Sequence, residues 1–378
     1  MKKIALVNQR YGLEVNGGSE YYTRLIAERL TDVFQVDVIT TKALNYTDWN
    51  NYYTADEEDI NGVHVRRFPT EKCRAEDFNE YNGEYLSKIS NGHFSEEEEK
   101  IWFEKQGPFC PAAIEFIKEN RDNYDAFIFV TYLYYLTVMG MPEVAEKSVF
   151  IPTAHEEPFI HFKTFEKIFT LPKAFVFLTD EEKDLVQNLF NCREIPCEVM
   201  GTGVEIPCEP NENAFRKKFG IEEEYIIYVG RIDEGKDCPM MFKYFMEYKS
   251  RRPESRLKLV LMGKPVCRIP KHGDIISLGF VSEEDKFSGI SGAKALVLPS
   301  KFESLSISVL EAMTLSVPVI VNGVCDYMNY FEFEGILDYI FSHDEEYALL
   351  CRNAEKYIEK NYRWDVIMRK FKEVIESI

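Results

Sequence analysis

The sequence predicts an α/β protein of two domains, each a doubly wound parallel sheet with helices on its faces. Its 378 residues, 45% of them hydrophobic, suffice for two separate cores. Short apolar runs bounded by Gly, Pro, Asn or Asp alternate with longer segments of helical period. The alternation stops at residues 206–213, where two prolines and several polar residues intervene, and then begins again. We therefore expect a linker there.

The first series supplies one Rossmann-like sheet with its crossover helices. Its expected strands are Ile4–Val7, Val36–Thr40, Val63–Phe68, Phe127–Val130, Val149–Pro152, Phe175–Leu178 and Glu198–Met200. Its expected helices are Gly18–Leu30, Glu97–Lys105, Pro111–Glu119, Tyr132–Met139 and Glu181–Leu189. Residues 46–109, rich in aromatic and acidic side chains, carry no motif and read as an insertion.

The second series repeats the pattern. Its expected strands are Tyr225–Val229, Leu257–Met262, Ile275–Leu278, Ala295–Leu298, Pro318–Val321 and Leu337–Phe341. Its expected helices are Pro239–Lys249, Glu283–Phe287, Leu305–Thr314 and Asp344–Lys360. Two such domains facing each other would form a cleft where the carboxyl ends of both strand sets meet, which is the usual ligand position in open α/β sheets.

Composition excludes several classes of protein. A formal charge of −19 argues against a nucleic-acid partner. The opening apolar run is too short for a secretory signal, and no stretch reaches the length of a membrane-spanning helix, so we expect a cytoplasmic protein. Nine cysteines without a C-x2-C pair suggest neither disulfides nor a zinc site. No D-x-D occurs that would anchor a divalent metal.

The segment LPSKFESLSISVLEAM, residues 298–313, holds two glutamates directly after a strand. If Ser304 opens a helix, Glu303 lies at its amino end and Glu311 roughly 12 Å further along. That separation exceeds the spacing of a glycosidase carboxylate pair and suits the two ends of one long ligand. An acidic helix start followed by an ordinary surface glutamate is the plainer alternative.

The segment GRIDEGK, residues 230–236, follows a strand and is a near match to the phosphate loop of NTPases. Asp237 stands where that loop needs Ser or Thr, which argues against a P-loop NTPase. The guanidinium of Arg231 and the ammonium of Lys236 remain, and two cations after a strand end suit a diphosphate leaving group. A turn with solvated charges is the alternative.

Two further segments follow strands of the first series. In NGGSE, residues 16–20, Gly17 and Gly18 would let backbone amides at a helix start approach an anion or a sugar closely. In PTAHEEP, His155 follows the strand Val149–Pro152, and Glu156 and Glu157 could stabilise its charge. A flexible turn and a structural histidine are the respective alternatives.

Taken together, NGGSE, PTAHEEP, YVGRIDEGKD, LPSKFESLSISVLEAM and PVIVNG resemble the successive signatures of family 4 retaining glycosyltransferases. Their combination is specific, and their order covers nearly the whole chain. The resemblance implies a GT-B fold in which the last helix crosses back to the first domain. It then implies an acceptor-side domain at residues 1–206 plus 362–378 and a donor-binding domain at 207–361.

The resemblance also implies roles for individual residues. Arg231 and Lys236 would bind the donor diphosphate, Glu303 the donor sugar and Glu311 the ribose, with His155 beside the transferred sugar. The expected catalytic residues are Glu303, Arg231, Lys236 and His155. The expected donor-binding residues are Gly17, Gly18, Gly230, Arg231, Lys236, Glu303, Ser304, Leu305 and Glu311.

The implied activity is metal-independent and cofactor-free transfer, with retention, from a nucleotide diphosphate-sugar to a glycan or lipid-linked acceptor. It would serve cell-surface polysaccharide or lipopolysaccharide synthesis, with peripheral contact at the inner membrane face. Ser304 stands where the family commonly has glycine, which leaves donor-sugar specificity open. A sugar-nucleotide epimerase or phosphorylase on the same fold, and an inactive nucleotide-sugar-binding paralogue, are the alternatives.

Overall fold

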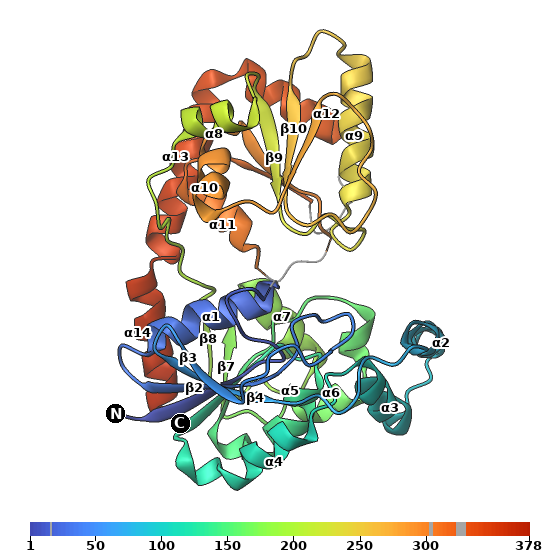
Figure 1. Cartoon of the computed structure of the whole chain (residues 1–378), viewed down its shortest axis with the longest axis vertical. Helices are drawn as coiled ribbons and strands as arrows, with labels where there is room; N and C mark the ends of the chain where they lie inside the picture. Colours follow the sequence, from blue (N-terminus) through green and yellow to red (C-terminus); the bar gives the residue numbers. More distant parts are fainter. Residues whose placement is uncertain (16, 302–304, 323–329) are drawn as a thin grey trace. The chain divides into compact units, whose positions relative to one another are not determined.

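The computed structural model describes every residue except 16, 302–304 and 323–329, and the chain divides into two compact units. Unit 1 contains Met1–Thr202 and Asp365–Ile378, and unit 2 contains Gly203–Trp364. The chain thus leaves unit 1 after residue 202 and returns to it after residue 364 (Figure 1). Each unit is built around one sheet.

The sheet of unit 1 has the strand order β3-β4-β2-β1-β5-β6-β7-β8. Every neighbouring pair is parallel except β3 with β4, which is antiparallel. The strands are β1 (Lys3–Val7), β2 (Gln35–Thr41), β3 (Glu57–Ile60), β4 (Val63–Phe68), β5 (Ala126–Val130), β6 (Ser148–Ile151), β7 (Ala174–Phe177) and β8 (Cys197–Val199). All seven strands expected for this unit occur, whereas β3 was not expected.

Helices cover both faces of this sheet, with α1 and α14 on one side and α4 and α5 on the other (Figure 1). The central strand β1 is buried from Ile4 to Val7, as a parallel strand covered on two faces must be. The helices are α1 (Gly18–Leu30), α2 (Phe78–Ser90), α3 (Glu96–Gln106), α4 (Pro111–Glu119), α5 (Tyr135–Gly140), α6 (Lys163–Ile168), α7 (Asp180–Leu189) and α14 (Trp364–Glu376), with short 3-10 helices at Arg121–Asn123, Met141–Lys147 and Pro158–His161.

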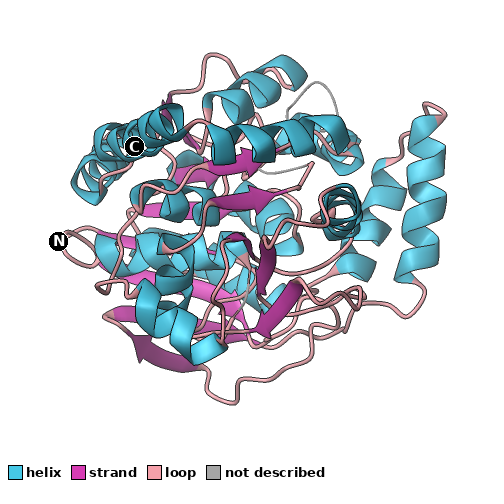
Figure 2. Cartoon of the chain, turned by 90° about the horizontal axis from the view of Figure 1, so that it is seen from above, coloured by secondary structure: helices cyan, strands magenta, loops and turns pink. Residues whose placement is uncertain are grey.

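The insertion at residues 46–109 contains the helix α2, which the sequence did not predict. With α3 it forms a pair of helices that projects at one edge of unit 1 (Figures 1 and 2). Trp102 of α3 anchors the pair, since its ring packs edge-on against both Phe78 and Phe162. The aromatic residues of the insertion therefore extend the core of unit 1.

The sheet of unit 2 is entirely parallel, with the strand order β11-β10-β9-β12-β13. Its strands are β9 (Tyr225–Val229), β10 (Lys258–Met262), β11 (Ile275–Gly279), β12 (Ala295–Leu298) and β13 (Val319–Val321). Figure 1 shows α9 and α12 on one side of it and α8, α10, α11 and α13 on the other. These helices are α8 (Glu212–Phe219), α9 (Cys238–Arg251), α10 (Glu283–Ser291), α11 (Ile307–Thr314), α12 (Tyr330–Ser342) and α13 (Asp344–Asn361).

One expected strand of unit 2 is wrong. Residues Leu337–Phe341 belong to the helix α12. The residues Phe333, Leu337 and Ile340 are buried, and their spacing of four and three is the helical period. A short apolar run cannot be assigned to strand or helix by hydrophobicity alone, and this helical run was therefore predicted as a strand.

The last helix, α14, packs within unit 1. The Nζ atom of Lys370 donates a hydrogen bond to the carbonyl oxygen of Val199 at 2.9 Å, and Ile367 and Phe371 are buried. None of the helices in the described ranges is both long enough and apolar enough to cross a membrane.

Glycines close the carboxyl ends of three neighbouring strands in unit 2. Gly230 follows β9, Gly263 follows β10 and Gly279 ends β11, all with positive φ. The amide of Gly230 donates to Met262 O at 2.9 Å and that of Gly263 to Gly279 O at 2.8 Å. A Cβ atom on Gly263 would lie 1.9 Å from Gly230 O, so only glycine fits this position.

We expect Gly263→Ala to lower the free energy of unfolding by roughly 2–4 kcal/mol, because the clash is with backbone and the φ of 139° is strained for alanine. Chemical denaturation measures this. Gly273→Ala is the matched control, because a Cβ there meets nothing within 4 Å. Equal stability of the two variants would contradict this account of the strand ends.

Candidate functional site

The loop between β9 and α9 carries the predicted phosphate-binding cations and is organised by Asp233. The Nε atom of Arg231 donates to Asp233 Oδ2, and the backbone amide of Lys236 donates to Asp233 Oδ1 at 2.9 Å. Asp233 is only 8% exposed, whereas the side chain of Arg231 is 44% exposed. The buried carboxylate thus fixes the loop and leaves the guanidinium accessible to an anion.

A second set of bonds fixes the same loop from the segment that follows the neighbouring strand β10. The buried residue Ile232 donates its amide to Lys264 O at 3.1 Å and accepts from the amides of Val266 and Cys267. The hydroxyl of Tyr228 donates to Arg231 O at 2.7 Å. The backbone around Arg231 is therefore preorganised, as a charge-stabilising site requires.

The loop after β12 lies beside the loop after β9, because β9 and β12 are neighbours in a parallel sheet. The Nζ atom of Lys301 lies 3.3 Å from Asp237 Oδ2, which ties the two loops together. Glu303 and Ser304, both predicted to bind the donor, are outside the residues that the structure describes. Leu305 is half-buried and precedes α11, whose amino end is capped by the Ser306 hydroxyl.

Glu311 is not the exposed acid of an ordinary helix surface. It is 5% exposed, and its Oε1 accepts a hydrogen bond from Lys286 Nζ of α10 at 2.7 Å. Burial raises the pKa of Glu311, and Lys286 opposes that rise. The predicted contact of Glu311 with the ribose hydroxyls stays a prediction.

In unit 1, Gly17 and Gly18 stand exposed at the amino end of α1. Glu20, one turn into this helix, is buried and accepts hydrogen bonds from Gln9 at 2.9 Å and from Arg10 at 2.5 Å. A Cβ atom on Gly17 would lie 2.1 Å from the Glu20 carboxylate. Glycine is therefore needed at position 17 so that the Glu20 network can hold the loop after β1.

His155 follows β6, also at the carboxyl edge of the sheet of unit 1. Its Nε2 lies 3.4 Å from Glu157 Oε2, and Glu157 accepts a hydrogen bond from the hydroxyl of Tyr132. Thr131 and Thr153, which follow β5 and β6, both have left-handed φ values of 73° and 52°. Such strain in β-branched residues is typical of functional sites.

Glu182, which the sequence analysis did not single out, holds the loop that bears His155. Its carboxylate accepts from the amides of Ala154 and Leu178, each at 2.7 Å. Burial raises its pKa to about 7, against the opposing effect of these bonds and of His155. Sequence inspection misses Glu182 and Lys286 because each bonds to a partner that is distant in sequence, Ala154 and Glu311 respectively.

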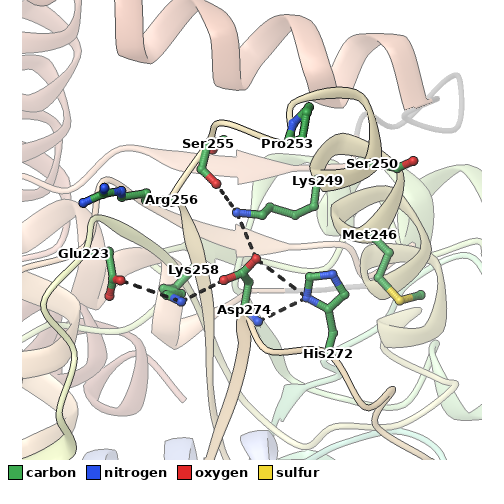
Figure 3. Close-up of a pocket in the computed structure, with 10 residues that line it drawn as sticks. All are labelled: Glu223, Met246, Lys249, Ser250, Pro253, Ser255, Arg256, Lys258, His272 and Asp274. Carbon is green, nitrogen blue, oxygen red and sulfur yellow. Dashed lines mark hydrogen bonds and ion pairs between the residues drawn. The ribbon is translucent and has the colours of Figure 1, made fainter.

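Figure 3 shows a pocket of about 490 Å³ in unit 2, at the opposite edge of the sheet. Its residues Lys258 and Asp274 lie where β10 and β11 begin. Asp274 pairs with Lys249 at 3.0 Å and with Lys258 at 2.7 Å, so these charges balance one another. Ligands of parallel α/β sheets bind at the carboxyl ends of strands, and we therefore place the donor site at the loops described above.

No group of three or more His, Cys, Asp or Glu among the described residues is placed to hold a metal ion. The cations that the structure offers to a diphosphate are side chains of the protein. The metal independence of the reaction stays a prediction.

Comparisons with known proteins agree with this architecture. Residues 211–336 match the family model of Glycosyl transferases group 1. The whole chain is similar to an uncharacterized glycosyltransferase of Methanocaldococcus jannaschii, at 24% identity over 97% of this chain and 96% of that protein.

Two solved structures have the same fold. A sucrose-phosphate synthase from Thermosynechococcus elongatus superposes with a TM-score of 0.71 at 14% identity, covering 100% of this chain and 99% of that one. The Anabaena protein HepE, solved with UDP-glucose, superposes with a TM-score of 0.71 at 13% identity, covering 100% of both chains. The predicted GT-B fold is thereby confirmed, and the family model that matches residues 211–336 agrees with the family resemblance.

Glu182 predicts a pH dependence of stability. Its pKa is about 7 when folded and about 4.5 when unfolded, so the folded state binds the extra proton between these values. Stability should therefore fall as pH rises from 4.5 to 7 and stay level above, by about 3 kcal/mol in total.

Glu182→Gln removes this titration, so the difference in unfolding free energy between the wild type and the variant should change by that amount between pH 5 and pH 8. Urea denaturation at several pH values measures it. Glu181→Gln, at the exposed neighbouring position, should instead follow the wild type at every pH. Parallel curves for Glu182→Gln would show that Glu182 is ionised throughout.

Proposed function

We propose that this chain transfers a sugar from a nucleotide diphosphate-sugar with retention of configuration and without a metal ion, which the match of residues 211–336 to the model of Glycosyl transferases group 1 supports. The acceptor we propose is a glycan or a lipid-linked saccharide used to build cell-surface polysaccharide or lipopolysaccharide. The observation that carries the proposal is the loop after β9, where Asp233 fixes the guanidinium of Arg231 and the backbone of Lys236, and which Lys301 ties to the loop after β12.

The donor would bind with its diphosphate at this pair. Arg231 presents a planar guanidinium that suits two phosphate oxygens, and Lys236 adds a compact ammonium charge. Its ribose would reach Glu311 on α11, and its sugar would reach Glu303. HepE, of the same fold, was solved with UDP-glucose, which supports a nucleotide-sugar donor of this kind.

In the proposed reaction, the bond between the sugar's anomeric carbon and the phosphate oxygen breaks, and the bond from that carbon to the acceptor oxygen forms on the same face. The departing phosphate oxygen receives the acceptor's hydroxyl proton. Arg231 and Lys236 stabilise the negative charge that develops on the leaving diphosphate, which is commonly the largest catalytic effect. His155 would contact the transferred sugar, and the Gly17–Gly18 amides would border the acceptor and the donor phosphates.

The acceptor and the cellular location rest on the family resemblance. A lipid-linked acceptor would place the enzyme in the cytoplasm, in peripheral contact with the inner face of the membrane. Thermal-shift measurements with UDP-, GDP-, ADP- and TDP-sugars would identify the donor, because a ligand that binds only the folded state raises the melting temperature.

We expect Lys236→Ala to reduce turnover of that donor by about two to three orders of magnitude, because a charge-stabilising group is lost from the transition state. Release of the nucleoside diphosphate measures turnover, with water as the acceptor where no other is known. NMR of the first-formed sugar tests retention.

Lys243→Ala is the matched control, since Lys243 is an exposed lysine on the following helix α9. It should leave turnover unchanged. Turnover that Lys236→Ala also leaves unchanged, in a variant with the wild-type melting temperature, would remove the assignment of this loop.

A further inference from the structure

The ion pair between Lys286 and Glu311 is one of the more buried charged contacts of unit 2. Both groups are largely buried, with side chains 18% and 6% exposed, and they come from the separate helices α10 and α11. Other lysines of this unit, such as Lys218 and Lys294, pair at the surface, where such contacts contribute little. The Lys286–Glu311 pair instead withdraws two charges from water, which costs free energy that their mutual attraction need not recover. A role in ligand binding would account for such a pair.

The two oxygens of Glu311 are in different situations. Oε1 accepts the hydrogen bond from Lys286. Oε2 accepts no hydrogen bond from any residue that the structure describes, and it is not fully buried. It therefore keeps some contact with solvent and has room to accept a hydrogen bond from a ligand.

The charge environment of Glu311 depends on α10. The charged groups that act on it are Lys286, which favours its ionised form, and Glu283, which disfavours it, and both belong to that helix. Burial is the main cause of the raised pKa of Glu311, and Lys286 limits the rise. Without Lys286 nothing among these groups would oppose protonation of the carboxyl.

We propose that Lys286 is a positioning residue for nucleotide binding: it keeps Glu311 ionised and occupies Oε1, so that Oε2 accepts the hydrogen bonds of the ribose hydroxyls. The inference rests on the proposed function, because it assumes a nucleoside diphosphate at the loops after β9 and β12. A hydrogen bond to an ionised carboxylate is about twice as strong as one to a neutral group, so the charge state of Glu311 sets the affinity for the ribose.

The test is Lys286→Met, with binding measured by calorimetry. The probes are UDP-glucose, GDP-mannose and ADP-glucose, whose diphosphate diesters do not titrate between pH 6 and pH 8. For the one that binds the wild type, we expect the affinity of the variant to fall about five- to tenfold at pH 8, as for the loss of a charged hydrogen bond.

The affinity of the variant should fall further as the pH is lowered to 6, because a carboxyl whose pKa has risen takes up its proton first. The wild type should change less over the same range. Lys286→Arg keeps the charge and should restore both the affinity and the flatter pH profile. Lys218→Met is the matched control, because it removes an exposed ion pair with Asp285 on the same helix α10, and it should bind as the wild type does.

A second probe separates positioning from mere structural support. The nucleoside diphosphate of the sugar donor that binds can be compared with its 2′,3′-dideoxy form, which lacks both ribose hydroxyls. Lys286→Met should weaken the binding of the ribonucleoside diphosphate and should change the binding of the dideoxy form little. Equal losses for the two nucleotides, or parallel pH profiles for variant and wild type, would overturn the inference alone. A wild type that binds none of the nucleotide sugars would overturn the proposed function, and this inference with it.

Discussion

The site of unit 2 depends on one carboxylate. Asp233 binds the guanidinium of Arg231 through one oxygen and the backbone amide of Lys236 through the other, and so joins two residues five positions apart on the loop that follows β9. Without it, these two bonds would be lost and the loop would have to be ordered by the ligand itself. Ordering a loop at the moment of binding costs conformational entropy, which reduces affinity. A buried acid that orders the loop beforehand avoids that cost and still leaves Arg231 accessible.

Unit 1 has two further buried carboxylates that each hold a loop after a strand. Glu20 gathers Gln9 and Arg10 after β1, and Glu182 gathers the amides of Ala154 and Leu178 after β6 and β7. In each case a helical acid near the amino end of its helix holds a loop that follows a parallel strand, where backbone amides lack ladder partners. The loops that bear Gly17, Gly18 and His155 are therefore built on buried carboxylates. The left-handed Thr131 and Thr153 show that the backbone there is held under strain.

The sequence predicted most of this fold because the strands of a parallel sheet covered on both faces are continuous apolar runs between polar breaks. It failed where that rule does not hold. The edge strand β3, with the sequence EEDI, is acidic and antiparallel, and the run Leu337–Phe341 is helical. The candidate site residues were predicted from strand ends, which mark ligand positions, and their roles stay predictions. The residues that support them were not predicted, because Lys286 lies 25 residues from Glu311 and Glu182 lies 28 residues from Ala154. No local sequence pattern links such pairs.

The acids and cations of unit 2 differ in burial, and under the proposed function the chemistry of a nucleotide sugar accounts for the difference. A diphosphate brings its own negative charge, so a cation that binds it can stay partly exposed, as Arg231 does beside Asp233 with a side chain 44% exposed. A ribose hydroxyl brings no charge, so a carboxylate that binds it in a buried position must be neutralised by the protein. Lys286 supplies that charge to Glu311. The partly exposed guanidinium and the buried ion pair thus meet one requirement in two ways, because a charged group that a ligand covers must have its charge compensated. The diphosphate would add compensating charge at Arg231, whereas Lys286 already supplies it to Glu311.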